Sequence, residues 1–127
     1  MSSVVLDTSA LLAVIKRERG GELVADAISE ALISSVNLAE ATSVLIRAGM
    51  APETAREILE IQEFDVADFD RALAEDTGAL IARTRRNGLS LGDCACLALA
   101  AREKLPALTV DHAWRGLDIG IEIQLIR

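Results

Sequence analysis

The 127-residue sequence is poor in the side chains on which several kinds of active site depend. It has no tyrosine, one tryptophan and two phenylalanines, so extensive stacking of nucleobases on aromatic rings is unavailable. Its one histidine, His112, has no evident serine or cysteine partner, which argues against a covalent nucleophile. Cys94 and Cys96 stand two residues apart in an apolar run, a spacing that favours neither a disulfide nor a zinc site.

The sequence also lacks any apolar run approaching the roughly 20 residues that a membrane-spanning helix needs. The first residues, MSSVVLD, carry no basic segment and place an acid inside the apolar stretch, unlike a secretory leader. With 51% hydrophobic residues, the chain can bury a core as one domain over residues 1–127. We therefore expect a soluble, cytoplasmic single-domain protein with no membrane partner.

A net charge of −7 argues at first against a nucleic-acid partner. Basic residues nevertheless gather locally at 16–19 and at 83–86, and acids clustered around cations would be neutralised. The cluster of Arg83, Arg85 and Arg86 could contact phosphates, or it could be a solvated helix end. The global charge is therefore weak evidence against a nucleic-acid substrate.

Short apolar runs alternate with helical patterns along the whole chain. Strands are expected at 4–6, 31–35, 64–66, 107–110 and 119–126. Helices are expected between them, notably over 52–62, 68–86 and 91–104. The last of these is apolar on nearly all sides, so it should be central, with room for a dimer interface. The alternation predicts an α/β fold: a central parallel sheet of four to five strands, flanked by helices on both faces.

Four acidic residues fall where such a fold would bring them to one edge of the sheet. Asp7 and Asp111 directly follow expected strands, whereas Glu40 and Asp93 stand near the starts of expected helices. Ligands of open parallel sheets bind beyond the carboxyl ends of the strands. We therefore expect the four acids to form one site. The hydroxyl groups nearby belong to Thr8, Ser9 and Thr109.

Each acid also has a purely structural explanation. Asp7 and Asp93 fit the cap and the first turn of a helix, where carboxylates are favoured. Glu40 stands three residues after Asn37, the spacing of a capping pair, and Asp111 could cap a short turn. Four unrelated acidic residues would have to fall at the same sheet edge by chance if each served only its own helix or turn. A common site is therefore the preferred interpretation.

Clustered carboxylates repel one another unless cations balance their charges. Their hard oxygen atoms select Mg²⁺, with Mn²⁺ as an alternative, and no histidine or cysteine set competes for a softer metal. Such ions activate water and stabilise in-line displacement at a phosphodiester. The four acids therefore indicate a metal-dependent hydrolase of phosphodiester bonds.

Three segments resemble a known family. Residues 5–12 (VLDTSALL) resemble the opening of PIN-domain nucleases. Residues 88–100 (GLSLGDCACLALA) and 105–114 (LPALTVDHAW) resemble the third and fourth acidic motifs of the VapC-type toxins within that family. Glu40 stands where the second acid is expected, and the resemblance spans essentially the whole chain in the right order.

The resemblance implies a single PIN domain acting as a Mg²⁺-dependent endoribonuclease toxin that cuts structured RNA, often transfer RNA. It implies that Asp7 and Asp93 are the main metal ligands and that Glu40 and Asp111 complete the catalytic cluster. It further implies three partners: a VapB-type antitoxin that blocks the acidic site, a second copy in a homodimer, and operator DNA reached only through the antitoxin.

Competing interpretations fit less well. A phosphorelay receiver domain would need an acidic pair after the first strand and a lysine after the fourth, and neither is present. Dinucleotide binding would need glycines where Asp7, Thr8 and Ser9 stand. The alternative that stays open is a catalytically inactive PIN-fold module that only binds partners in a regulatory complex. Retention of all four acids argues against it.

Overall fold

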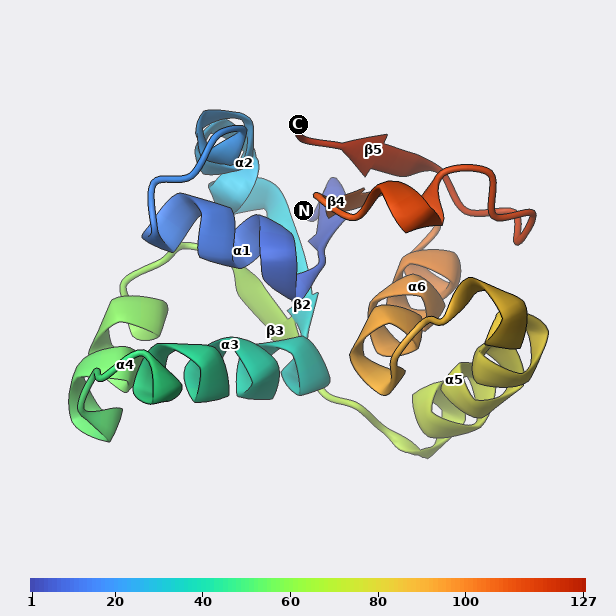
Figure 1. Ribbon diagram of the computed structural model, residues 1–127, viewed down its shortest axis with the longest axis horizontal. Coiled ribbons are helices and arrows are strands. Elements are labelled where there is room, and N and C mark those ends of the chain that lie inside the picture. Colours follow the sequence, from blue (N-terminus) through green and yellow to red (C-terminus); the bar gives the residue numbers. More distant parts are fainter.

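The computed structural model describes all residues, 1–127, as five strands and six α-helices, with two α-helices after each of the first three strands (Figure 1). The elements are β1 (Val4–Leu6), α1 (Thr8–Ile15), α2 (Gly21–Ala27), β2 (Ala31–Ser34), α3 (Ser35–Arg47), α4 (Pro52–Glu60), β3 (Asp65–Ala67), α5 (Arg71–Arg83), α6 (Leu91–Glu103), β4 (Ala107–Thr109) and β5 (Ile123–Leu125). Single turns of 3₁₀-helix occupy Ile28–Glu30, Arg85–Asn87 and His112–Trp114.

All five strands run parallel in the order β3-β2-β1-β4-β5. The chain builds outward from β1 to β2 and β3, and then returns to the other side of β1 to add β4 and β5. The direction of strand addition therefore reverses between β1 and β4. A crevice forms beyond the carboxyl ends of the strands at such a reversal. The predicted α/β class is confirmed, and the sheet has five strands.

Alternate residues of each central strand enter different cores, as the two-residue period of a strand requires. Leu6, Ile33 and Leu108 point into a core with α1 to α4. Val5, Leu32 and Ala107 point into a second core with α5 and α6. Figure 1 shows the two groups of helices on opposite sides of the sheet. The sheet is therefore covered on both faces, as predicted.

The boundaries of α5 and β5 differ most from those predicted. The helix predicted over 68–86 begins only at Arg71, since the Asp70 carboxylate caps it by accepting from the Leu73 amide at 2.9 Å. It ends near Thr84, whose hydroxyl donates to the Leu80 carbonyl at 2.7 Å. The last strand is also shorter than predicted and covers only Ile123–Leu125.

The apolar helix α6 is central, as predicted, but it is covered within the chain. From Gly92 to Ala100 every residue except Asp93 is buried, mainly against α5 and the sheet. Its apolar surface is therefore not left free for a second copy, and the suggestion that it offers a dimer interface is wrong. No helix of the structure is both long and apolar enough to cross a membrane.

Candidate active site

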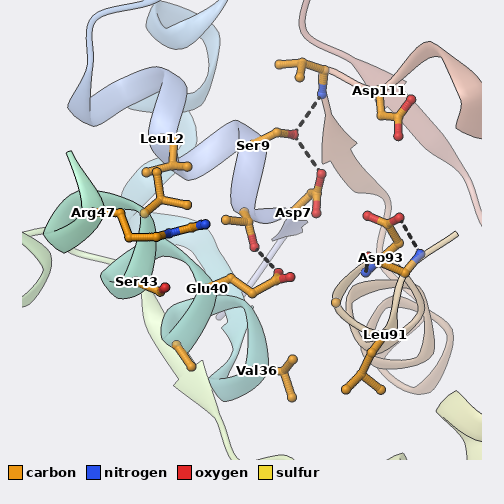
Figure 2. A pocket seen from close by; sticks show the side chains of 16 residues that line it. Asp7, Ser9, Leu12, Val36, Glu40, Ser43, Arg47, Leu91, Asp93 and Asp111 are labelled. Atoms are coloured by element: carbon orange, nitrogen blue, oxygen red, sulfur yellow. Dashed lines mark hydrogen bonds between the residues drawn. The ribbon is translucent and has the colours of Figure 1, made fainter.

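A cleft of about 910 Å³ opens beyond the carboxyl ends of β1 and β4, and all four predicted acids line it (Figure 2). Asp7 directly follows β1, and Asp111 follows β4 by two residues. Glu40 extends from the second turn of α3, and Asp93 is the third residue of α6. Residues far apart in sequence thus meet at the sheet edge where the strand order reverses.

Asp7 is 5% exposed and stands at the N-cap position of α1, yet its side chain makes no capping hydrogen bond. The hydroxyls of Ser9 and Thr109 donate instead to its Oδ2, at 2.7 and 2.9 Å. Each hydroxyl in turn accepts a backbone N–H from the segment after β4, belonging to Val110 at 3.2 Å and Asp111 at 3.0 Å. Two chains of hydrogen bonds, each from a backbone N–H through a hydroxyl to Oδ2, therefore fix the Asp7 carboxylate. The capping explanation for this residue is wrong.

Glu40 is held through one oxygen, Oε1, which accepts from the Thr8 hydroxyl at 2.6 Å and from Asn37 Nδ2 at 3.1 Å. The alternative explanation of Asn37 and Glu40 as a capping pair is wrong, because the cap of α3 is Ser34, whose hydroxyl accepts from the Val36 amide at 3.2 Å. Glu40 consequently lies one turn further along the helix than the sequence suggested.

Asn37 is a positioning residue of the site that sequence reasoning missed. Its side chain is fully buried, and its Nδ2 also lies 3.1 Å from the Gly92 carbonyl and 3.0 Å from the Thr8 hydroxyl. It thereby connects α3 with the starts of α1 and α6. The signal was present: Asn37 shares a four-residue spacing with Ala41 and Leu45, the other buried positions of α3. A polar residue in such a series has a buried partner.

Gly92 makes room for Glu40. A Cβ atom at position 92 would collide with both carboxylate oxygens of Glu40. Glycine in a helix is unfavourable by about 1 kcal/mol relative to alanine. Helix stability therefore does not explain the glycine at position 92. The reason is the close approach of the Glu40 carboxylate to the start of α6.

For Asp93 and Asp111 the capping explanation is correct. Asp93 forms a capping box with Ser90: its Oδ2 accepts from the Ser90 amide at 2.8 Å, and its own amide donates to the Ser90 hydroxyl at 3.1 Å. Asp111 Oδ1 accepts from the Ala113 amide at 2.9 Å and caps the following turn. These bonds orient both carboxylates at the rim of the cleft, so capping and a shared site coexist.

The four carboxylates share one pattern. In each, a single oxygen is held by donors of the protein, and the second oxygen accepts no hydrogen bond from any other side chain. The held oxygens are Oδ2 of Asp7, Oε1 of Glu40, Oδ2 of Asp93 and Oδ1 of Asp111. A carboxylate fixed in this way is oriented while retaining an oxygen for a further ligand.

The acids are close enough to influence one another's protonation. Burial raises the pKa of Asp7 from 3.8 to about 6, and the charge of Asp93 adds to this rise, although the Ser9 and Thr109 hydroxyls and the Thr8 amide act in the opposite direction. The pKa of Asp93 is also raised, by burial first and then by the charges of Asp111 and Glu40. Ionisation of the carboxyl groups at this site is therefore energetically unfavourable unless a positive charge lies nearby.

The donor set fits a hard divalent cation by its chemistry: apart from Arg47, the polar side chains that line the cleft carry only carboxylate and hydroxyl oxygens. As they stand, however, no three of the acidic, histidine or cysteine side chains converge closely enough to hold an ion. Because each acid is held by its own donors, the carboxylates are oriented towards the cleft but remain separated from one another. Binding an ion would require the carboxylates to move closer together.

With one exception, the cationic side chains lie away from the cleft. Arg83, Arg85 and Arg86 do not line it and are exposed, in agreement with the solvated helix end that was one of their two interpretations. Arg47, which sequence reasoning did not select, does line it. Trp114 is fully buried in the core that contains α6.

Comparison with known proteins agrees with this architecture. The PIN domain family matches residues 4–119, and the chain belongs to that family. Within it, the chain is 28% identical to ribonuclease VapC28 of Mycobacterium tuberculosis over 127 residues, which covers 92% of each protein. The resemblance to the VapC branch is thereby confirmed.

Two solved structures share the fold. The first, DNA-bound VapBC from Salmonella typhimurium, has a TM-score of 0.77 and 25% identity, with full coverage of both chains. The second is the sarcin-ricin loop cleaving toxin VapC20 of Mycobacterium tuberculosis, with a TM-score of 0.72 and 19% identity. The alignment covers 86% of this chain and 90% of the VapC20 chain. The PIN-like fold predicted from the sequence is therefore confirmed.

Proposed function

We propose that this chain is the Mg²⁺-dependent endoribonuclease toxin of a toxin–antitoxin pair and that it hydrolyses a phosphodiester bond of a structured RNA. The observation that carries the proposal is the shared pattern of the four acids, each held through one oxygen with the other left for a ligand. Membership of the PIN family and similarity to a VapC ribonuclease support it. Transfer RNA is the substrate we would test first, beside ribosomal RNA.

Asp7 and Asp93 would hold the ion, with Glu40 and Asp111 completing the cluster directly or through water; Mn²⁺ could take the place of Mg²⁺. The bound ion would supply charge neutralisation and activation of water for attack on phosphorus. The free Oε2 of Glu40 is suited to accept a proton from the attacking water, because Thr8 and Asn37 fix the carboxylate through Oε1. The Ser9 and Thr109 hydroxyls keep Asp7 oriented.

We also propose a VapB-type antitoxin as the protein partner, with operator DNA bound through that antitoxin and a homodimer of this chain in the assembly. The Salmonella complex, which contains both VapB and DNA, supports this proposal. Such an assembly would act in the cytoplasm. Isolation of the tagged chain from its native host, followed by mass spectrometry and light scattering, tests the partner and the stoichiometry.

The test of the activity is incubation of the purified chain with total cellular RNA, with Mg²⁺ or with EDTA. Asp93→Asn is the matched inactive variant, since asparagine retains an acceptor for the Ser90 amide while losing the charge. Asp26→Asn, an exposed position on α2 outside the cleft, is the control substitution. Discrete fragments are expected for the wild type and Asp26→Asn only, and only with Mg²⁺.

Sequencing of the fragment ends would then identify the RNA and the bond. Equal cleavage by Asp93→Asn would overturn the metal-site assignment. Absence of cleavage of transfer and ribosomal RNA under any divalent metal would favour the inactive binding module instead. Circular dichroism spectra of all three proteins should coincide, which excludes misfolding as the cause of lost cleavage.

A further inference from the structure

The acidic cleft contains a single cationic side chain, and the catalytic scheme above gives it no role. Arg47 is the only lysine, arginine or histidine among the 16 residues that line the cleft. It is exposed and takes part in none of the three salt bridges of the structure, whereas Arg71, Arg102 and Arg127 each pair with a carboxylate. Its charge is thus available to a ligand.

The position of Arg47 follows from the geometry of α3. It stands seven residues after Glu40, two helical turns on the same face and about 10 Å along the axis. Side chains of a helix lean towards its N-terminus, which brings the guanidinium back towards the acids. Figure 2 shows this orientation: the guanidinium extends along the cleft wall above Glu40 and below Leu12.

We propose that Arg47 binds a phosphate of the RNA next to the scissile one; this inference rests on the proposed ribonuclease function. A guanidinium presents paired N–H donors that match phosphate oxygens. A cleft with four carboxylates repels RNA unless cations offset them, and Arg47 is the one wall residue that attracts the backbone. Because it lies beyond Glu40 rather than among the acids, it contacts a neighbouring phosphate and positions the strand.

The competing explanation is structural. Arg47 is the basic residue in the last turn of α3, where a positive charge is favoured by the helix dipole. That role predicts a small change in stability when the charge is removed and no change in the salt dependence of RNA binding. A phosphate contact predicts the reverse, since each neutralised phosphate releases counterions.

The experiment measures binding of a short, fluorescently labelled single-stranded RNA of mixed sequence at several KCl concentrations, in Mg²⁺. The parent is Glu40→Gln, chosen to bind without cleaving, and Arg47→Gln is added to it. Arg47→Lys tests rescue by charge. Arg56→Gln, an exposed arginine on α4 outside the cleft, is the matched control.

We expect Arg47→Gln to weaken RNA binding roughly 5- to 20-fold at low salt and to reduce the slope of log K against log [KCl] by about 0.7. Arg47→Lys should restore the slope, and Arg56→Gln should change neither quantity. In the cleaving protein, Arg47→Gln should raise KM by a similar factor and leave kcat within about twofold.

If Arg47→Gln leaves the slope of log K against log [KCl] for RNA binding unchanged, the inference is overturned. It is also overturned if Arg47→Gln weakens binding to an antitoxin but leaves the affinity for RNA unchanged. The binding assay requires no turnover, so the two proposals fail separately. If RNA binding depends on Arg47 but the chain cleaves no RNA, the ribonuclease proposal is wrong and the phosphate contact is supported. If the chain cleaves RNA but Arg47→Gln has no effect on binding, the ribonuclease proposal is supported and the phosphate contact is wrong.

Discussion

Asp7→Asn should make the metal-free protein more stable at neutral pH, although it removes a side chain that accepts two hydrogen bonds. The pKa of Asp7 is raised in the folded chain from 3.8 to about 6, so ionising this group opposes folding. The difference corresponds to about 3 kcal/mol when the folded carboxyl is fully ionised. An amide at the same position has no charge to bury.

The hydrogen bonds do not reduce this gain further, because the pKa of about 6 already includes the lowering effect of the Ser9 and Thr109 hydroxyls. Both hydroxyls donate to Oδ2, so the single amide oxygen of asparagine can replace that acceptor and its NH₂ group can face the cleft. We therefore expect a gain of about 3 kcal/mol, or roughly 9–15 °C in Tm for a chain of this length.

The stability difference between Asp7→Asn and the wild type should depend on pH. Between pH 4 and pH 6 the unfolded chain loses its Asp7 proton before the folded chain does, so wild-type stability falls as pH rises through this window. The advantage of Asp7→Asn should consequently be absent near pH 4, grow through this window and reach its full value above about pH 7. Urea denaturation in EDTA at several pH values measures it, with Asp26→Asn as control.

The reasoning would be refuted if Asp7→Asn were less stable than the wild type at neutral pH, or if its advantage were the same near pH 4. Either result would mean that the carboxylate stabilises the fold, as a helix cap does. Adding Mg²⁺ gives an independent check, because an ion that binds only the folded wild type should narrow or reverse the difference.

Three further predictions concern the groups that hold the acids. Gly92→Ala should displace the Glu40 carboxylate and lower RNA cleavage at least about tenfold with little loss of helicity, measured by kinetics and circular dichroism. Asn37→Ala should leave Glu40 with one donor and a cavity beside it, lowering both cleavage and stability, the latter by about 1–3 kcal/mol in urea denaturation. Ser90→Ala should remove the cap of α6 and cost about 1 kcal/mol, with a normal Tm as the contradicting result.

The sequence was sufficient to predict the parts of the site that depend on strand ends. Asp7 and Asp111 follow strands that pair in parallel, so their meeting at one edge follows from the fold class. The run that is apolar on nearly all sides likewise predicted α6 as a central helix. These features are local or follow from topology alone, which explains why they could be predicted.

The missed features depend on the approach of one helix to another. The spacing of Asn37 to Glu40 fits a capping pair, which was one of two explanations, whereas the buried Asn37 side chain meets Gly92 of α6. The special need for glycine at position 92 and the direction of Arg47 into the cleft arise in the same way. Sequence spacing within one helix does not encode its distance to a helix more than forty residues away, so these contacts required the structure.

The most direct test of the account is the rate of RNA cleavage as a function of Mg²⁺ concentration for the wild type and four amide variants, Asp7→Asn, Glu40→Gln, Asp93→Asn and Asp111→Asn. We predict cleavage that is abolished by EDTA and restored by Mg²⁺, with a loss of at least about 100-fold in Asp7→Asn and Asp93→Asn, and of at least about 10-fold in the other two. Cleavage that persists in EDTA, or full activity in Asp7→Asn or Asp93→Asn, would contradict it.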